Sequence, residues 1–246
     1  MPGLTRGPSF LKSIFERGEM SGFSLFADTF FRIDLIWRYW PDIVGAMVVT
    51  IEIAVCVVVT GITIGIALAL LRARGWRTLN FFIIVISDVN RALPPLVLVL
   101  LAYFGLPHLG IYLSSFAVLW VVLSLVLAAF SEEIFWAGIL SIRKGQWDAA
   151  RSTGLGFAQA LLFVVFPQAL RLTVPPLTNR TIVIIKNTAL GSLIGVPEIL
   201  NVASTAESFV GNITPLTLGA IAYLILFVPV TIFGRWLETR FAWKRA

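Results

Sequence analysis

Long apolar stretches recur along the chain and are separated by shorter segments that hold most of its charged residues. Asp, Glu, Lys and Arg are absent from residues 53–71, 92–107, 109–131 and 213–234. About 20 apolar residues are enough for an α-helix to cross the hydrocarbon core of a bilayer. A membrane β-barrel would instead need short segments of alternating polarity, whereas these stretches are apolar on every side. The pattern predicts an all-α, polytopic membrane protein.

We expect about five membrane-spanning helices, at residues 43–71, 79–105, 109–133, 165–195 and 214–235. Hydropathy alone identifies the first, second, third and fifth of these spans. The fourth, residues 165–195, carries Arg171, Arg180, Lys186 and two adjacent prolines. Polar and helix-breaking residues are tolerated at membrane depth where they face protein or a wet cavity. We therefore interpret residues 165–195 as an interior helix that lines a path through the membrane.

Basic residues gather in three of the segments that flank these spans, at residues 72–77, 143–151 and 235–245. The two remaining connections, residues 106–108 and 196–213, contain no Lys or Arg. Loops on the cytoplasmic side of a membrane carry an excess of Lys and Arg, so the three basic segments are expected there. Five spans then place the N-terminus outside and the C-terminus in the cytoplasm.

The first 42 residues differ from the rest because aromatic side chains are mixed with five basic and five acidic ones. They lack the basic tip, apolar core and cleavage site of a secretory signal peptide. Aromatic rings are favoured at the membrane interface. We expect residues 1–42 to form an external or interfacial segment, followed by a single transmembrane domain over residues 43–240.

Composition excludes several classes of function. Only 13% of the residues are charged, compared with roughly 25% in an ordinary soluble domain. With a single cysteine, Cys56, and a single histidine, His108, no group has the spacing of a metal site. No phosphate-binding loop of the Gly-x-x-x-x-Gly-Lys-Ser/Thr type is present. We interpret Cys56 as a small core residue and His108 as a solvated turn residue, and expect no catalysis, cofactor, metal or nucleic acid.

The segment between the third and fourth spans has a distinctive spacing. It reads Gly145-Gln146-Trp147-Asp148-Ala149-Ala150-Arg151-Ser152-Thr153-Gly154 and, after nine residues, Val164-Val165-Phe166-Pro167. This resembles the cytoplasmic "EAA" loop of ABC importer permeases, which reads Glu-Ala-Ala, three residues, Gly, nine residues and Ile-x-Leu-Pro. Asp148 replaces the Glu, and Val164 and Phe166 replace the Ile and Leu. The resemblance implies a coupling loop over about residues 136–165, with contacts from Gly145, Gln146, Asp148, Ala149, Ala150, Gly154 and Pro167.

Further motifs in the same order narrow the resemblance to the permeases of polar amino acids, such as histidine, glutamine and arginine. They are Arg91-Ala92-Leu93-Pro94-Pro95-Leu96, Ala102-Tyr103-Phe104-Gly105-Leu106-Pro107, Glu133-Ile134-Phe135, Pro167-Gln168-Ala169-Leu170, Lys186-Asn187-Thr188-Ala189-Leu190 and Gly195-Val196-Pro197-Glu198. Trp136 stands where the family usually has Arg, and Ala92 where it often has Gly. The likeness covers about residues 45–235 and implies the type I ABC importer permease fold.

The physical properties of the coupling loop agree with this resemblance. A basic, amphipathic segment suits docking into a groove on a soluble partner. We expect Asp148 in the first turn of a short helix, where the helix dipole favours an anion. Ala149 and Ala150 allow close approach, and Gly154 can supply the left-handed residue that ends a helix. The alternative is an ordinary solvated loop with one helical turn.

The resemblance also implies partners. Two permease subunits, either two copies or two paralogues, would pair with two separate ATPase subunits and receive a polar amino acid from an external substrate-binding protein. The resemblance also implies that the complex lies in the bacterial inner membrane, where the lipid bilayer is itself a partner.

Polar side chains at membrane depth are default candidates for function. They are Glu52, Asp88, Asn90, Arg91, Glu132, Glu133, Asn179, Arg180, Lys186 and Asn187. Lys186 and Asn187 could bind the carboxylate of a zwitterion, and Glu52 could face its ammonium group. Arg91, which precedes Pro94-Pro95, could line the path but is better interpreted as pinning a broken helix. For each, the alternative is a structural ion pair or a helix-end side chain that reaches the interface.

Two other classes of membrane protein remain as alternatives. A secondary transporter or channel would explain the helices and the intramembrane charges, but not the coupling loop. A membrane enzyme would need convergent carboxylates or histidines, whereas Glu132 and Glu133 are adjacent and point about 100° apart on a helix. The sequence leaves open which amino acid, or amino-acid conjugate, is carried.

Overall fold

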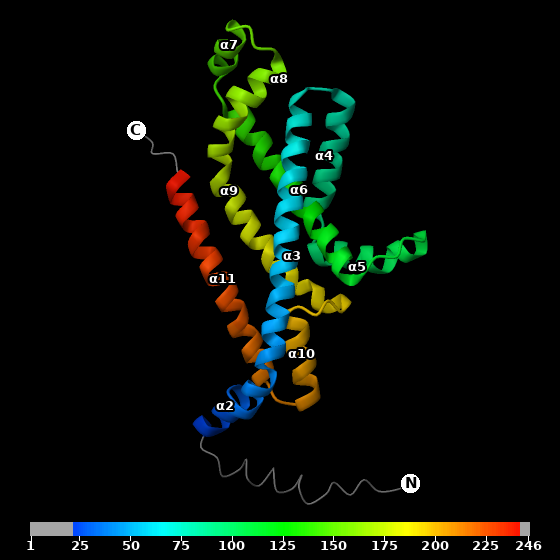
Figure 1. The fold of residues 1–246 in the computed structure, drawn as a ribbon. Coiled ribbons are helices and arrows are strands. Elements are labelled where there is room, and N and C mark those ends of the chain that lie inside the picture. The colour runs from blue at the N-terminus through cyan, green and yellow to red at the C-terminus, as the bar shows by residue number, and fades with distance from the viewer. Residues whose placement is uncertain (1–21, 242–246) are drawn as a thin grey trace, which may run out of the picture.

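The computed structural model describes residues 22–241, and these form helices and turns with no strand among them (Figure 1). The helices are α2 (Gly22–Phe30), α3 (Ile33–Ala73), α4 (Arg77–Ala92), α5 (Pro95–Gly105), α6 (Ser115–Ser141), α7 (Lys144–Ser152), α8 (Phe157–Gln159), α9 (Phe166–Lys186), α10 (Ile199–Val210) and α11 (Thr214–Phe241). Two 3₁₀ segments, η1 (Leu106–Leu109) and η3 (Asn187–Ile194), and a π-helical segment, η2 (Ala160–Val165), complete the described chain. The all-α prediction is confirmed.

The longest element, α3, forms the axis of the molecule. Its 41 residues begin at Ile33 rather than near residue 43, and they extend about 60 Å at 1.5 Å per residue. From Ile43 to Ala69 buried residues recur every three or four positions, which gives one continuous face. The first part of this face packs on α10 and α11, and the rest packs on α6. At Gly65 a β-carbon would collide with the side chain of Ser131, so only glycine permits this close approach of the two helices.

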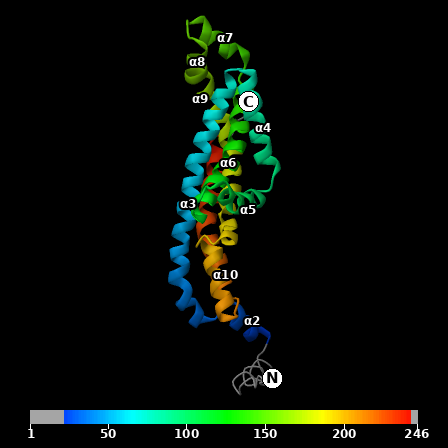
Figure 2. The ribbon, with the colours of Figure 1, turned by 90° about the vertical axis from the view of Figure 1, so that its right-hand side faces the viewer.

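The second predicted span, residues 79–105, is not a single straight helix. It consists of α4 and α5, which are bent by 103° at the break between them. Leu93 lies before Pro94 and is extended, because a residue that precedes proline avoids the helical region. Pro95 then begins α5, where its missing N–H costs no hydrogen bond. Figures 1 and 2 show α4 running from the turn after α3 to the middle of the molecule, where α5 leaves sideways.

The fourth span is confirmed as a long helical run, over Phe157–Ile194, that includes the π-helical segment and the proline pair. The segment after it, predicted as a plain connection, contains the unpredicted helix α10. The buried Glu198 side chain accepts hydrogen bonds from the backbone N–H groups of Leu200 and Asn201, at 3.0 and 2.8 Å, and so caps α10. Tyr223 of α11 donates to the same carboxylate, which fixes α10 against α11.

By length and composition, four helical segments of the described chain could cross a membrane, or five if the α4–α5 pair counts as one. The turn between α3 and α4, the short helices α7 and α8, and the end of α11 all lie toward one end of the molecule (Figure 1). The opposite end holds α2 and α10, so the predicted basic segments are grouped at one end. Most of the basic residues expected in loops lie instead within helices or at their ends, and Arg72 lies in the last turn of α3.

Part of the predicted interfacial segment, residues 1–21, lies outside the described residues. The remainder includes α2, whose Phe26 is exposed, and the first part of α3. Asn212 donates to the Asp28 carbonyl at 3.0 Å, and the Arg32 N–H donates to Thr214 at 3.1 Å. These bonds attach the junction of α2 and α3 to the start of α11.

Candidate functional site

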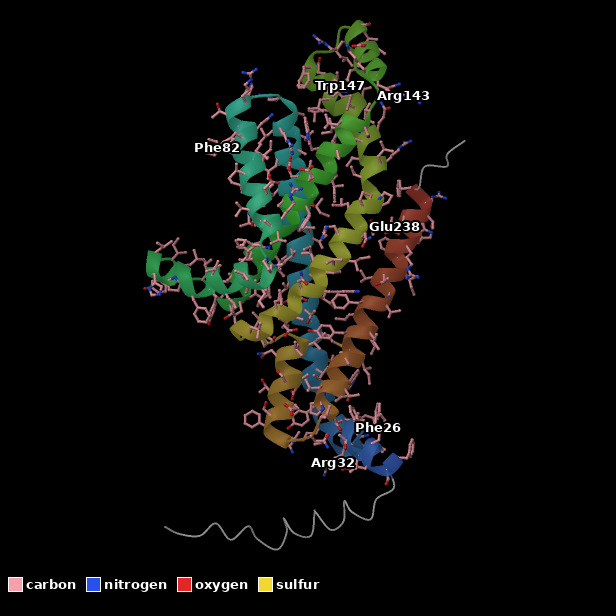
Figure 3. All side chains as sticks on the ribbon, turned by 180° about the vertical axis from the view of Figure 1, so that it is seen from behind. Phe26, Arg32, Phe82, Arg143, Trp147 and Glu238 are labelled. Atoms are coloured by element: carbon pink, nitrogen blue, oxygen red, sulfur yellow. The ribbon has the colours of Figure 1, made fainter. Side chains whose placement is uncertain are left out.

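The predicted coupling loop forms a compact helical cap made of α7, α8 and η2 at the basic end of the molecule (Figure 3). Trp147 of α7 stacks on Phe157 of α8, with ring centroids 5.4 Å apart. The amide of Gln168 donates to the Gln146 side chain at 3.1 Å, which joins α7 to the start of α9. The alternative of an ordinary solvated loop is therefore disfavoured, because the segment is packed and ordered.

The predicted coupling residues divide between the two faces of α7. Ala150 is buried, whereas Gly145, Asp148 and Ala149 are exposed. Asp148 is the fifth residue of the helix, so the prediction that it lies in the first turn is wrong. The helix dipole acts mainly over the first turn and does not determine the choice of an acidic residue at this position.

Gly154 ends the α7 segment as expected. It has φ of +87°, in the left-handed region that β-carbons disfavour, and no other atom lies close to where its β-carbon would be. Backbone conformation, not space, is therefore the requirement at this position. Pro167 lies exposed within the first turn of α9.

A cluster of five charged side chains lies between α3, α4 and α6. Arg72 donates to Glu132 at 2.8 Å and contacts Glu133 at 3.4 Å. Arg91 pairs with Asp88 on its own helix and with Glu133 at 3.3 Å. The interpretation of Arg91 as a residue that pins the broken helix is therefore supported, because these bonds fix the end of α4 against α6.

Glu132 is the most deeply placed member of this cluster, with 0% of its side chain exposed. Its Oε1 accepts from Arg72, while its Oε2 is buried and has no hydrogen-bond partner in the described part of the chain. The Arg72 guanidinium also lies 4.8 Å from the ring centre of Trp136, which covers it. The sequence predicted Arg72 in a cytoplasmic loop, and only its position directly after the apolar run, which ends at Leu71, could have suggested otherwise.

Next to the charged cluster, residues of α4, α6 and α9 line an open cavity of about 520 Å³. Its lining includes four of the polar residues predicted at membrane depth, namely Arg91, Glu133, Asn179 and Arg180. The guanidinium of Arg180 lies 3.8 Å from the ring centre of Phe130, and no carboxylate of the described chain pairs with it. The cavity thus presents a cation without a counter-ion, an amide and a carboxylate.

The other predicted path residues are not brought together. Lys186, at the end of α9, is exposed and lines a separate open groove of about 580 Å³ that faces α11. Within the described residues it forms no ion pair with Glu52, Glu132 or Glu133. The carboxylates of Glu132 and Glu133 pair with arginine, and Glu52 is exposed. Asn187 begins the 3₁₀ segment η3. The described residues contain no group of three metal-binding side chains.

Residues 61–243 match the family described as the inner membrane component of binding-protein-dependent transport systems. The Bacillus subtilis protein named "Probable glutamine ABC transporter permease protein GlnM" is 33% identical over 178 residues, which is 72% of this chain and 82% of that protein. The glutamine transport system permease protein GlnP of Escherichia coli is 31% identical over 210 residues, or 83% of this chain and 95% of the relative.

Solved structures agree with this match. An amino acid ABC transporter crystallised with histidines has a TM-score of 0.75 and 28% identity, over 83% of this chain and 96% of the other. A methionine ABC transporter, MetNI, in an inward-facing conformation has a TM-score of 0.62 at 18% identity, over 86% of this chain and 99% of the other, which supports the fold alone. The chain therefore belongs to the family of ABC transporter permeases, the multi-pass inner membrane components of binding-protein-dependent transport systems, and has the type I importer fold.

Proposed function

We propose that the chain forms the path by which an ABC importer takes up polar amino acids, with a substrate passing the cavity between α4, α6 and α9. The observation that supports this most directly is the unpaired Arg180 guanidinium in a cavity that also holds the Glu133 carboxylate. The relatives named as glutamine permeases and the similar structure that holds histidines support the same class of substrate. As a member of this family the chain is not an enzyme, and ATP hydrolysis belongs to separate subunits.

The cavity suits a zwitterion for electrostatic reasons. A free α-carboxylate would find a counter-ion in Arg180 and a hydrogen-bond donor in Asn179, and an ammonium group would find Glu133. Hydrogen bonds to charged groups contribute about 1.5–3 kcal/mol each, which is enough to replace part of the hydration that the substrate loses. Glu133 is shared with Arg72 and Arg91, so a passing ammonium group competes with existing partners and is not held tightly.

Coupling is assigned to α7 and the residues around it. The exposed Gly145, Asp148 and Ala149 form the outer surface that would enter a groove on the ATPase, and Gly154 shapes the end of that surface. Two ATPases, a second permease subunit and an external binding protein complete the proposed assembly. The basic end that holds α7 is proposed to face the cytoplasm, with the N-terminus outside and the C-terminus inside.

Transport by the purified permease–ATPase complex, reconstituted in liposomes with a fluorescent or radioactive polar amino acid, tests the cavity. Arg180→Gln should raise the KM for uptake at least about tenfold, because one charge-assisted hydrogen bond is lost. Arg77→Gln, in an exposed residue at the far start of α4, is the matched control and should leave KM unchanged. An unchanged KM in Arg180→Gln would refute the proposed passage.

Lys186, Asn187 and Glu52 stay candidates for a second stage of the path. If Lys186 contacts the substrate, Lys186→Met should lower uptake. The yield of the complex and its basal ATPase rate should remain normal, because Lys186 forms no ion pair within the described chain that the substitution would break. Wild-type uptake by Lys186→Met would remove it from the path.

A further inference from the structure

A second polar cleft, separate from the proposed passage, lies where α6, α7, α9 and α11 approach one another. Its volume is about 1030 Å³. Three arginines from three different elements line it: Arg143 before α7, Arg171 on α9 and Arg240 in the last turn of α11. Figure 3 shows Arg143 beside Trp147 at the end of the molecule that holds α7.

The cleft has an unbalanced charge. No Asp or Glu lines it, and none of the three arginines forms an ion pair within the described residues. Glu238, the acidic residue nearest to Arg240 in the chain, is not part of the lining. The remaining polar groups include the Gln146 and Gln168 amides. Three cations that share one cleft repel one another unless an anion lies between them.

The depth of the cleft relative to the membrane follows from the ends of the helices that form it. Helices α6 and α11 are both long and apolar enough to cross a membrane, and they end at Ser141 and Phe241. Both of these terminal residues line the cleft, together with Arg240. The ends of membrane-spanning helices lie at the level of the lipid headgroups. One turn before Arg240, the exposed Trp236 stacks on Phe233, and aromatic rings favour this same level.

We propose that this cleft binds the phosphate group of an anionic phospholipid from the leaflet that faces α7. Guanidinium groups match phosphate oxygens in bidentate geometry, and arginines from three elements would surround one headgroup. Such a lipid would connect the coupling helix to α9 and α11, because Arg143 directly precedes α7. The proposal does not depend on which substrate is carried.

The test uses the permease–ATPase complex in nanodiscs of phosphatidylcholine that contain roughly one quarter phosphatidylglycerol, an anionic lipid, followed by exchange into phosphatidylcholine. Mass spectrometry then counts the phosphatidylglycerol that remains bound. We expect retention by the wild type and a loss of about fivefold in affinity for each of Arg143→Gln, Arg171→Gln and Arg240→Gln. Arg77→Gln, which carries the same change away from the cleft, should retain lipid as the wild type does.

Three results would overturn the proposal. Equal retention of phosphatidylglycerol by the triple variant and the wild type would show that the cleft holds no lipid. Displacement of phosphatidylglycerol by millimolar inorganic phosphate would assign the cleft to a soluble anion. Loss of the ATPase from the triple variant, with lipid retention unchanged, would assign the arginines to the subunit interface.

Discussion

Replacing Arg72 with glutamine should destabilise the permease by about 3–5 kcal/mol, the effect of removing one partner from a buried ion pair. The structure supports the upper part of this range, because the Glu132 side chain is 0% exposed and that of Arg72 only 13%. Arg72 donates the hydrogen bond to Glu132 Oε1, and Oε2 has no partner in the described chain. The variant would leave a buried carboxylate without its counter-ion, because the glutamine amide that replaces the guanidinium is neutral.

The measurement is the free energy of unfolding of the purified permease in mild detergent, followed by tryptophan fluorescence against denaturant. The double variant Arg72→Gln/Glu132→Gln should recover at least about 2 kcal/mol relative to Arg72→Gln alone, because the unpaired charge is removed as well. Both variants lose the contact between Arg72 and Trp136, so the recovered free energy of unfolding reports on the ion pair and not on that contact.

An exposed pair at the start of α3 provides the matched control. Arg32 and Asp34 are 3.0 Å apart, with side chains 47% and 63% exposed. Such surface pairs contribute about 0–1 kcal/mol, so Arg32→Gln should change stability little. If Arg72→Gln is no more destabilised than Arg32→Gln, the buried cluster does not stabilise the fold and the reasoning is refuted.

Single cysteines at Arg74 and Asn201, in a chain without its natural cysteine, should react with an impermeant reagent from opposite sides of the membrane; reaction from the same side would contradict the proposed orientation. Gly154→Val should uncouple uptake from ATP hydrolysis or release the ATPase, because φ of +87° costs a β-branched residue about 1–2 kcal/mol. Gly75→Val carries the same backbone strain at φ of +78° outside the coupling loop, and should keep coupling intact. Normal coupling in Gly154→Val would count against this loop as the interface.

Features that depend on short stretches of chain could be predicted from the sequence. The helical class and most of the long helices follow from the length of the apolar runs, because a backbone in lipid must satisfy its own hydrogen bonds. The left-handed Gly154 follows from its place after a short helix. The basic segments lie at one end because spans and loops alternate, so that two successive spans return the chain to the same side of the membrane.

Some local expectations were nevertheless inaccurate. Helix α10 was missed because its apolar face is short and interrupted by polar residues, and the signal that was available, Glu198 as its N-terminal cap, was interpreted only as part of a motif. The break at Pro94 was expected, but the 103° bend after it was not, because proline disfavours a continued helix without setting the new direction. The turn in which Asp148 lies was misjudged because the helix begins at Lys144.

The candidate site was decided by tertiary structure. Arg72 and Glu132 are 60 positions apart, and the sequence distinguishes Arg72 from Arg74 and Arg77 only by its position directly after the apolar run. Their pairing requires α3 and α6 to approach closely, which the glycine at position 65 permits opposite Ser131. Because of the same packing, Glu133 lines the cavity that also holds Arg180, whereas Lys186 lines a separate groove. The sequence determines which segments cross the membrane, because burial of apolar runs is a local property, whereas the partner of each buried charge depends on how helices distant in the chain pack together.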